Sequence, residues 1–399
     1  MKNRVSCLLV TVIVSLMAGT LIARDINLDA IYINPGSPVY GRLLEKKLEA
    51  YQLAGSEFID RDVIFAGWGD GNTVLYVKEL PQLNVAYAYN RVLRKSREIG
   101  RIVGTITALK QSAGGSYLFI KRLVEVPGAV PRGETLILNV ATKQITVLNS
   151  AYPFIDFSVA PGGNSILYES GGNIVELIPE TESRSVTVRR PDYADITRSG
   201  EPVIAHLSPN GKKAVLVSGS GGSYRSKLTA AGASWELPGV TSATELYWLD
   251  NNQLVYRKGA SGNYSVCLYD AVTRRSTILL DNSLNTNIHY SSYPKIITFL
   301  KNQIIRVYDV RKREMINTCL EGEDASFSPD GNRFISLYLK KLFVTGITSV
   351  KKKNTELTKK AKEIVALYHS LLENGKELSN DYSGEYVQKK ISAYGSISD

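Results

Sequence analysis

Cysteine, histidine, methionine and tryptophan are scarce in this sequence, at three residues each among 399. The cysteines and histidines form no CxxC pair and no cluster with metal-ligand spacing, so we predict no zinc site. The sequence also contains no HExxH motif, no Walker phosphate-binding loop and no GxSxG nucleophile motif. These absences predict a chain that is not an enzyme of the common motif-bearing classes, with no catalytic residue, metal or cofactor.

Long apolar runs are equally scarce, and the one that stands out covers residues 5–23. The short basic segment MKNR precedes it and Arg24 follows it, which is the pattern of an export signal cleaved after Ala23. The run is also just long enough for an uncleaved membrane anchor. Both alternatives place the rest of the chain outside the cytoplasm, in the periplasm or at the cell surface.

Cysteine usage gives little support for a disulfide framework. Cys7 lies inside the apolar run, so only Cys267 and Cys319 remain after processing. The two could pair in an oxidising compartment. The repeat units described below place them on different kinds of strand, which favours two buried thiols.

The residues that are abundant favour strands. The chain has 23 tyrosines against 9 phenylalanines, 32 glycines and many β-branched residues. Aromatic and β-branched side chains are enriched in strands, and glycine is enriched in tight turns. A long chain of this composition is typical of a β-sandwich, barrel or propeller rather than of an α/β enzyme.

One short pattern recurs along the chain, and its clearest copy is ASFSPDGNRFISLY at residues 325–338. Each copy is an apolar run, a turn rich in Gly, Pro, Asn or Asp, and a second apolar run. The seven turns are centred near Gly71, Gly115, Gly163, Gly211, Asn252, Pro294 and Gly331. Their spacing of 37 to 48 residues is typical of the blades of a β-propeller.

Two further strands complete each unit. SVCLYDA at 265–271 and IIRVYDV at 304–310 are third strands, and a fourth follows each after a polar turn. We name the four strands A to D in chain order. The sequence therefore predicts an all-β fold, a propeller of seven four-stranded blades, with six or eight as the alternative counts.

The SPDG-type turns resemble those of the TolB-type β-propeller repeat, a relative of the WD repeat. Three sets of residues carry the resemblance: Ser328–Gly331, Ser208–Gly211 and Ala160–Gly163. The resemblance covers roughly residues 60–347 and implies the propeller architecture. The family belongs to the periplasm and has a globular domain ahead of a propeller of usually six blades. This chain has a short segment there and seven predicted blades, so the resemblance implies no particular partner.

The segments outside the propeller are short. We divide the chain into a signal or anchor (1–23), a closure strand and short helix (24–60), the propeller (61–349) and a helix with a tail (350–399). The strand AIYIN at 30–34 is expected to complete the last blade, because that blade lacks a strand D of its own. Residues 39–53 and 355–378 are expected to be helical, the second amphipathic and capped by Asn354 or Thr355. Its apolar stripe, which includes Leu357, packs on the propeller or binds a partner.

Basic residues recur in and beside the predicted C–D turns. They are Arg94, Lys95, Arg97, Lys143, Arg184, Arg274, Arg275, Arg311, Lys312 and Arg313, and the A–B turns add Lys212, Lys213 and Arg333. In an up-and-down blade these turns emerge on one face, so scattered charges gather into one surface. The alternative is plain solvation of exposed turns.

The function predicted from these observations is an interaction module or scaffold in the cell envelope. Its predicted partner is an envelope protein or an anionic surface, bound through the basic face, and nucleic acid is not expected. A propeller that binds glycan or anionic lipid is the second interpretation. An envelope enzyme with a site in the central channel is the third, and it requires carboxylate, His or Arg side chains that converge at the channel mouth.

Overall fold

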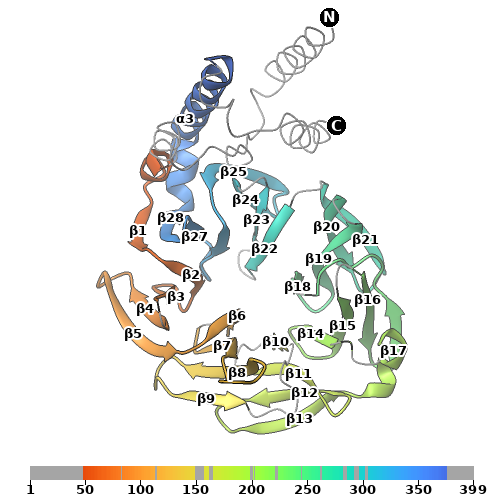
Figure 1. Ribbon diagram of the computed structural model, residues 1–399. Helices are drawn as coiled ribbons and strands as arrows, with labels where there is room; N and C mark the ends of the chain where they lie inside the picture. Colours follow the sequence, from red (N-terminus) through yellow and green to blue (C-terminus); the bar gives the residue numbers. More distant parts are fainter. Residues whose placement is uncertain are drawn as a thin grey trace, which may run out of the picture.

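The structure, a computed structural model, describes residues 48–374 except 82, 113–114, 149–156, 161–164, 198–200, 202, 221–222, 244, 261–262, 282–284, 292–295 and 302–303. These residues form seven four-stranded antiparallel sheets arranged in a ring (Figure 1). The chain is a seven-bladed β-propeller. The predicted fold and blade number are therefore confirmed, whereas the export segment, the strand expected at 30–34 and the tail from Ser379 lie outside the described residues.

Six blades use four consecutive strands, with strand A innermost and strand D outermost (Figure 1). Blade 1 contains β2 (Val63–Trp68), β3 (Thr73–Glu79), β4 (Asn84–Asn90) and β5 (Lys95–Ile102). Blade 2 contains β6 (Thr105–Gln111), β7 (Tyr117–Val124), β8 (Arg132–Asn139) and β9 (Ile145–Leu148). Blade 3 contains β10 (Phe157–Val159), β11 (Ile166–Ser170), β12 (Asn173–Ile178) and β13 (Ser183–Val188).

Two short 3-10 helices, η2 (Arg190–Asp192) and η3 (Ala194–Ile196), lie between blades 3 and 4. Blade 4 contains β14 (Val203–Leu207), β15 (Lys213–Ser220), β16 (Ser223–Ala230) and β17 (Ala233–Glu236). Blade 5 contains β18 (Leu246–Trp248), β19 (Gln253–Ala260), β20 (Asn263–Asp270) and β21 (Arg275–Asp281). Blade 6 contains β22 (Asn285–Ser291), β23 (Ile296–Lys301), β24 (Ile304–Asp309) and β25 (Glu314–Glu321).

The core is divided among the seven interfaces between neighbouring blades, with one cluster of buried apolar residues at each. Strand B is therefore apolar at consecutive positions, as at residues 74–77, because both of its faces are covered. Cys267 is buried on β20, a strand C, and Cys319 lies on β25, a strand D. The two cysteines form no disulfide with each other and lie on different kinds of strand, as predicted, but only Cys267 is buried and Cys319 is half-buried.

Blade 7 joins the two ends of the propeller. It contains β26 (Asp324–Phe327), β27 (Arg333–Tyr338) and β28 (Lys341–Gly346), and its fourth strand is β1 (Glu57–Asp60) from the other end of the chain. β1 runs antiparallel to β28, with Glu57 opposite Val344. An N-terminal strand thus closes the ring as predicted, but the segment is Glu57–Asp60 and not residues 30–34, because it follows directly on a helix that anchors it.

That helix, residues 48–53, packs with a longer C-terminal helix against blades 6 and 7. The ring of Tyr51 is 1% exposed and stacks on Phe343, with 4.4 Å between ring centroids. The C-terminal helix α3 (Ile347–Asn374) begins directly after β28, so the predicted start at residue 355 is wrong. The helix begins before residue 355 because Val350, in its first turn, is fully buried in the same apolar cluster as Leu357. Packing on the propeller is confirmed for Leu357.

Candidate functional site

The A–B and C–D turns lie at one end of the propeller, which we call the turn end. This follows from the antiparallel order of the strands, and backbone hydrogen bonds show it directly. Arg91 N donates to Asn72 O in blade 1 at 2.9 Å, and Ala271 N donates to Asn252 O in blade 5 at 2.7 Å. Each bond joins the C–D turn of a blade to the A–B turn of the same blade. We call the C–D turn the outer turn and the A–B turn the inner turn.

Four outer turns share one local design. Each begins with an Asn or Asp whose side-chain oxygen accepts hydrogen bonds from backbone N–H groups further along the turn. These capping residues are Asn90, Asn139, Asp270 and Asp309, and their bonds are 2.8 to 3.0 Å long. The backbone N–H of Thr273 makes the largest contribution to lowering the pKa of Asp270. The acids of these turns are therefore held in the turn itself.

The same four turns place a basic residue in the left-handed backbone region. The φ values are +50° for Arg94, +63° for Lys143, +57° for Arg274 and +54° for Arg313. Glycine, asparagine or aspartate is the usual choice at such a position, because other side chains are strained there. Turn formation alone therefore does not account for arginine or lysine at four equivalent positions.

The basic outer turns occupy neighbouring blades. Blades 5, 6, 1 and 2 carry them, and blade 7 lies between blades 6 and 1. The equivalent residue is Glu182 in blade 3, and the outer turn of blade 4 is Ala231 and Gly232. We define the basic arc as the exposed basic residues in and beside the outer turns of blades 5, 6, 1 and 2. They are Arg94, Lys95, Arg97, Lys143, Arg274, Arg275, Arg311, Lys312 and Arg313.

The remaining predicted basic residues do not join the arc. Lys213 is half-buried and ties blade 4 to blade 5, since its Nζ donates to Asn251 O at 2.9 Å. Lys212 and Arg184 are exposed but belong to blades 4 and 3. Arg333 lies 3.8 Å from the Asp330 carboxylate of its own turn. The guanidinium of Arg274, within the arc, stacks over the Trp235 ring and so also has a packing role.

Three exposed apolar side chains stand beside the arc, and the sequence interpretation missed them. Val92 is 74% exposed and Leu93 is 67% exposed in the outer turn of blade 1. Val272 is 67% exposed at the matching position of blade 5. The sequence contained a signal for them, because apolar residues stand within turns that are otherwise polar, in RVLRK and AVTRR.

The central channel is the second candidate region, and polar side chains of strand A join each blade to the next there. Five reach forward to the following blade: Lys110 to Phe157 O, Ser158 to Ala205 O, His206 to Ala243 O, Tyr247 to Ile288 O and His289 to Asp324. Three reach back: Gln111 to Trp68 O, Trp68 Nε1 to Ser326 O and Trp248 Nε1 to His206 O. All seven interfaces carry at least one such contact, so most channel polar groups are structural.

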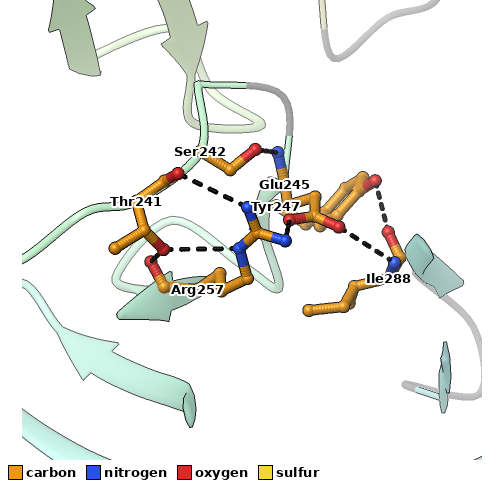
Figure 2. Close-up of polar contacts among 6 residues, drawn as sticks. All are labelled: Thr241, Ser242, Glu245, Tyr247, Arg257 and Ile288. Carbon is orange, nitrogen blue, oxygen red and sulfur yellow. Dashed lines mark hydrogen bonds and ion pairs between the residues drawn. The ribbon is translucent and has the colours of Figure 1, made fainter. Parts of the chain in front are cut away.

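Blade 5 holds the densest of these contacts (Figure 2). Arg257 Nη1 lies 2.7 Å from the Glu245 carboxylate, and Arg257 Nε donates to Thr241 Oγ1 at 3.3 Å. The Tyr247 hydroxyl donates to Ile288 O of blade 6 at 2.6 Å. Burial raises the pKa of Tyr247, and the Glu245 carboxylate adds to the effect. The cluster therefore fixes the blade 5–6 boundary.

His289 and Asp324 form an ion pair between blades 6 and 7, with 2.6 Å between Nε2 and Oδ1. Burial opposes the charge on His289, but the Asp324 charge and hydrogen bond, helped by Glu245, raise the pKa of the imidazole. Burial likewise opposes the charge on Asp324, and His289 reverses this and lowers the pKa of the carboxyl. By contrast, burial lowers the pKa of His206 to about 4, so that ring is neutral.

A cavity of about 390 Å³ adjoins this ion pair, away from the turn end. Its lining residues are Val63, Ile64, His289, Glu323, Asp324, Leu337 and Lys340. Among the described residues no three His, Cys, Asp or Glu side chains are grouped so as to hold a metal ion. The cavity can admit a small polar molecule beside the His289 imidazole and the Asp324 carboxylate.

No protein-family model matches the sequence, and no curated protein matches it. Solved structures do match the fold. An oligogalacturonate lyase in complex with manganese has a TM-score of 0.53 at 10% identity, over 75% of this chain and 92% of the lyase. TolB from Acinetobacter baumannii has a TM-score of 0.38 at 18% identity, over 54% of this chain and 53% of TolB. At 10% identity, the likeness to the lyase is one of fold alone. In the described part of the chain, no helix is both long and apolar enough to span a bilayer.

Proposed function

We propose that the chain is a non-catalytic β-propeller that acts outside the cytoplasm as an interaction module of the cell envelope. The basic arc binds the partner, which is an envelope protein or another anionic surface. The apolar run at residues 5–23, with its basic start, supports export. Electrostatic complementarity of this kind steers association and makes it sensitive to salt.

The observation that carries the proposal is the left-handed conformation of Arg94, Lys143, Arg274 and Arg313. A turn selected for folding alone favours glycine or asparagine at this position. Solvation alone explains a charged residue on any exposed position, but it does not explain the same choice at four strained ones. A binding role for the side chains accounts for that choice.

An enzyme with a site at the channel mouth is the second candidate function. The His289–Asp324 pair favours it, because a histidine with a raised pKa beside a carboxylate is a common acid–base arrangement and here adjoins a cavity. The same pair also joins blades 6 and 7, as equivalent residues join the other blades. A structural role therefore explains the pair without catalysis.

Charge reversal in blade 6 tests the proposal. The full chain with Arg311→Glu, Lys312→Glu and Arg313→Glu should lose about tenfold in capture of its partner by crosslinking and pull-down from the native envelope. Raising the salt concentration should weaken wild-type capture in the same way. The matched control is Arg184→Glu with Lys212→Glu, which reverses exposed charges of blades 3 and 4. Equal capture by the wild type and both variants would refute a role for the arc.

A further inference from the structure

The outer turns of the arc combine exposed apolar tips with basic flanks. In blade 1, Val92 and Leu93 precede Arg94 and Lys95 directly. In blade 5, Val272 takes the position of Val92, and Arg274 and Arg275 follow it. Basic residues attract anionic head groups, and apolar side chains beside them bury into the boundary between head groups and acyl chains. An acidic protein surface explains the charges but leaves three exposed apolar side chains without a role.

We propose that the basic arc docks on an anionic lipid surface, with Val92, Leu93 and Val272 inserted among the head groups. This inference rests on the proposed function and names the partner of its binding surface. The partner is identified by its chemistry, a negatively charged bilayer. An acidic protein is the alternative occupant, and the experiments below separate the two.

The arrangement of the turns fits a flat partner. The basic turns lie on both sides of blade 7 and all emerge at the turn end, in one ring of equivalent positions. A planar anionic surface can contact the outer turns of blades 5, 6, 1 and 2 at once. The outer turn of blade 3 is acidic and that of blade 4 is uncharged, so the opposite side of the propeller is not attracted to such a surface. The molecule therefore meets the surface with the blade 7 side of its turn end.

Acidic residues near the arc do not cancel its charge toward the surface. Asp270 and Asp309 point their carboxylates at the backbone of their own turns. Glu57 lies 4.0 Å from Arg94, whose side chain is 81% exposed and so remains available to solvent. Lys312 lies 3.9 Å from Asp309 and is also mostly exposed.

The course of the chain agrees with this orientation. The described chain begins at residue 48 against blade 7, which is the middle of the arc. The apolar run at residues 5–23 precedes that point, with residues 24–47 between them. As an anchor, this run would hold the arc beside a bilayer. As a cleaved signal, it would leave the arc as the attachment to the surface.

Co-sedimentation with lipid vesicles tests the proposal. The purified full chain is mixed with phosphatidylcholine vesicles with and without phosphatidylglycerol, so any binding through residues 5–23 appears in both samples. The readout is the extra binding to the anionic vesicles, which should fall as salt rises. Each Lys or Arg of the arc that is neutralised should lower this binding about fivefold. The control pair Arg184→Gln and Lys212→Gln should leave it unchanged.

Leu93→Trp tests insertion directly, because the side chain is exposed and its substitution leaves the core intact. Brominated lipid in anionic vesicles should quench the new tryptophan. Val186→Trp is the matched control, since Val186 is 55% exposed on β13 of blade 3 and should not be quenched. Quenching at Leu93 alone is the expected result.

Three results would overturn the inference. The first is equal binding to neutral and anionic vesicles, and the second is a bound protein whose tryptophan at Leu93→Trp is not quenched. The third is capture of an envelope protein through the arc with no binding to anionic vesicles, which leaves the proposed function standing with a protein as the partner. If the wild-type chain neither binds anionic vesicles nor captures an envelope partner, the proposed function is refuted as well.

Discussion

Inner and outer turns lie side by side at the turn end, yet they follow different rules. The inner turns of blades 2, 4 and 7 place Gly115, Gly211 and Gly331 at φ values of +67° to +69°. Four outer turns place arginine or lysine at similar φ values. Glycine adopts this conformation without strain, and a side chain does not. The inner turns thus have the residue that suits the conformation, whereas the outer turns have a basic side chain in a strained one.

The polar side chains of the two regions differ in the same sense. On the inner strands, Lys110, His206 and His289 each have a partner in the next blade. Basic residues of the outer turns, such as Lys143 and Arg313, extend into solvent. A change in the inner region should therefore alter stability first, and a change in the outer region should alter binding first.

Gly115→Ala should give the largest effect. A Cβ at residue 115 would lie 2.2 Å from the Cα of Gly69, in the inner turn of blade 1, and the φ of +69° adds strain. We expect the free energy of unfolding to fall by about 3 kcal/mol or more. Gly211→Ala is the matched control, because its φ is +68° with no atom within 4 Å of the new Cβ. It should lose only about 1 kcal/mol. Equal losses in urea unfolding would show that packing between inner turns contributes nothing.

His289→Gln should give a smaller, pH-dependent loss. The raised pKa of His289 stabilises the fold below its unfolded pKa, and this is lost as pH rises through the folded value. The lowered pKa of Asp324 stabilises the fold above its unfolded value, and this is lost as pH falls through the folded one. The pair thus contributes most between about pH 4 and about pH 6.5.

Because both side chains are about a third exposed, we expect a loss of about 1 kcal/mol near pH 5.5, and convergence with the wild type as pH rises through the folded pKa of His289. Thermal or urea unfolding across this range measures it. Arg313→Gln in the outer region is the control and should show no such window. A loss at His289 that is constant with pH would mean that packing, and not the ion pair, joins blades 6 and 7.

Local rules made the blades predictable, but they missed the closing strand. Glycine and proline turns recur between apolar runs, so the period and the four-strand unit could be found from the sequence. β1 is only four residues, EFID, with an acid at each end, and looks weaker than AIYIN. Its place is fixed by the free edge of β28 and by Tyr51 packed between blades 6 and 7. Those partners lie almost 300 residues away.

The candidate site was predictable in part for the same reason. Strand order gathers the outer turns at one end, so most residues of the arc could be named in advance. The hydrogen bond of Lys213 to the next blade could not be predicted, because its partner, Asn251, lies 38 residues further along the chain. The ties along the channel, such as Trp68 to Ser326, also cross between blades and leave no spacing to detect.

Arg313→Gly gives the smallest change in stability and the sharpest test of the comparison between the two kinds of turn. Glycine relieves the strain at a φ of +54°, so the free energy of unfolding should rise by up to about 1 kcal/mol. Arg275→Gly is the matched control, because Arg275 begins β21 and glycine in a strand should cost about 0.5–1 kcal/mol. Each variant removes one charge from the arc, so both should weaken binding to anionic vesicles about fivefold. If Arg313→Gly destabilises the propeller as much as Arg275→Gly does, the basic residue serves the turn itself, and the separation between a folding region and a binding region fails.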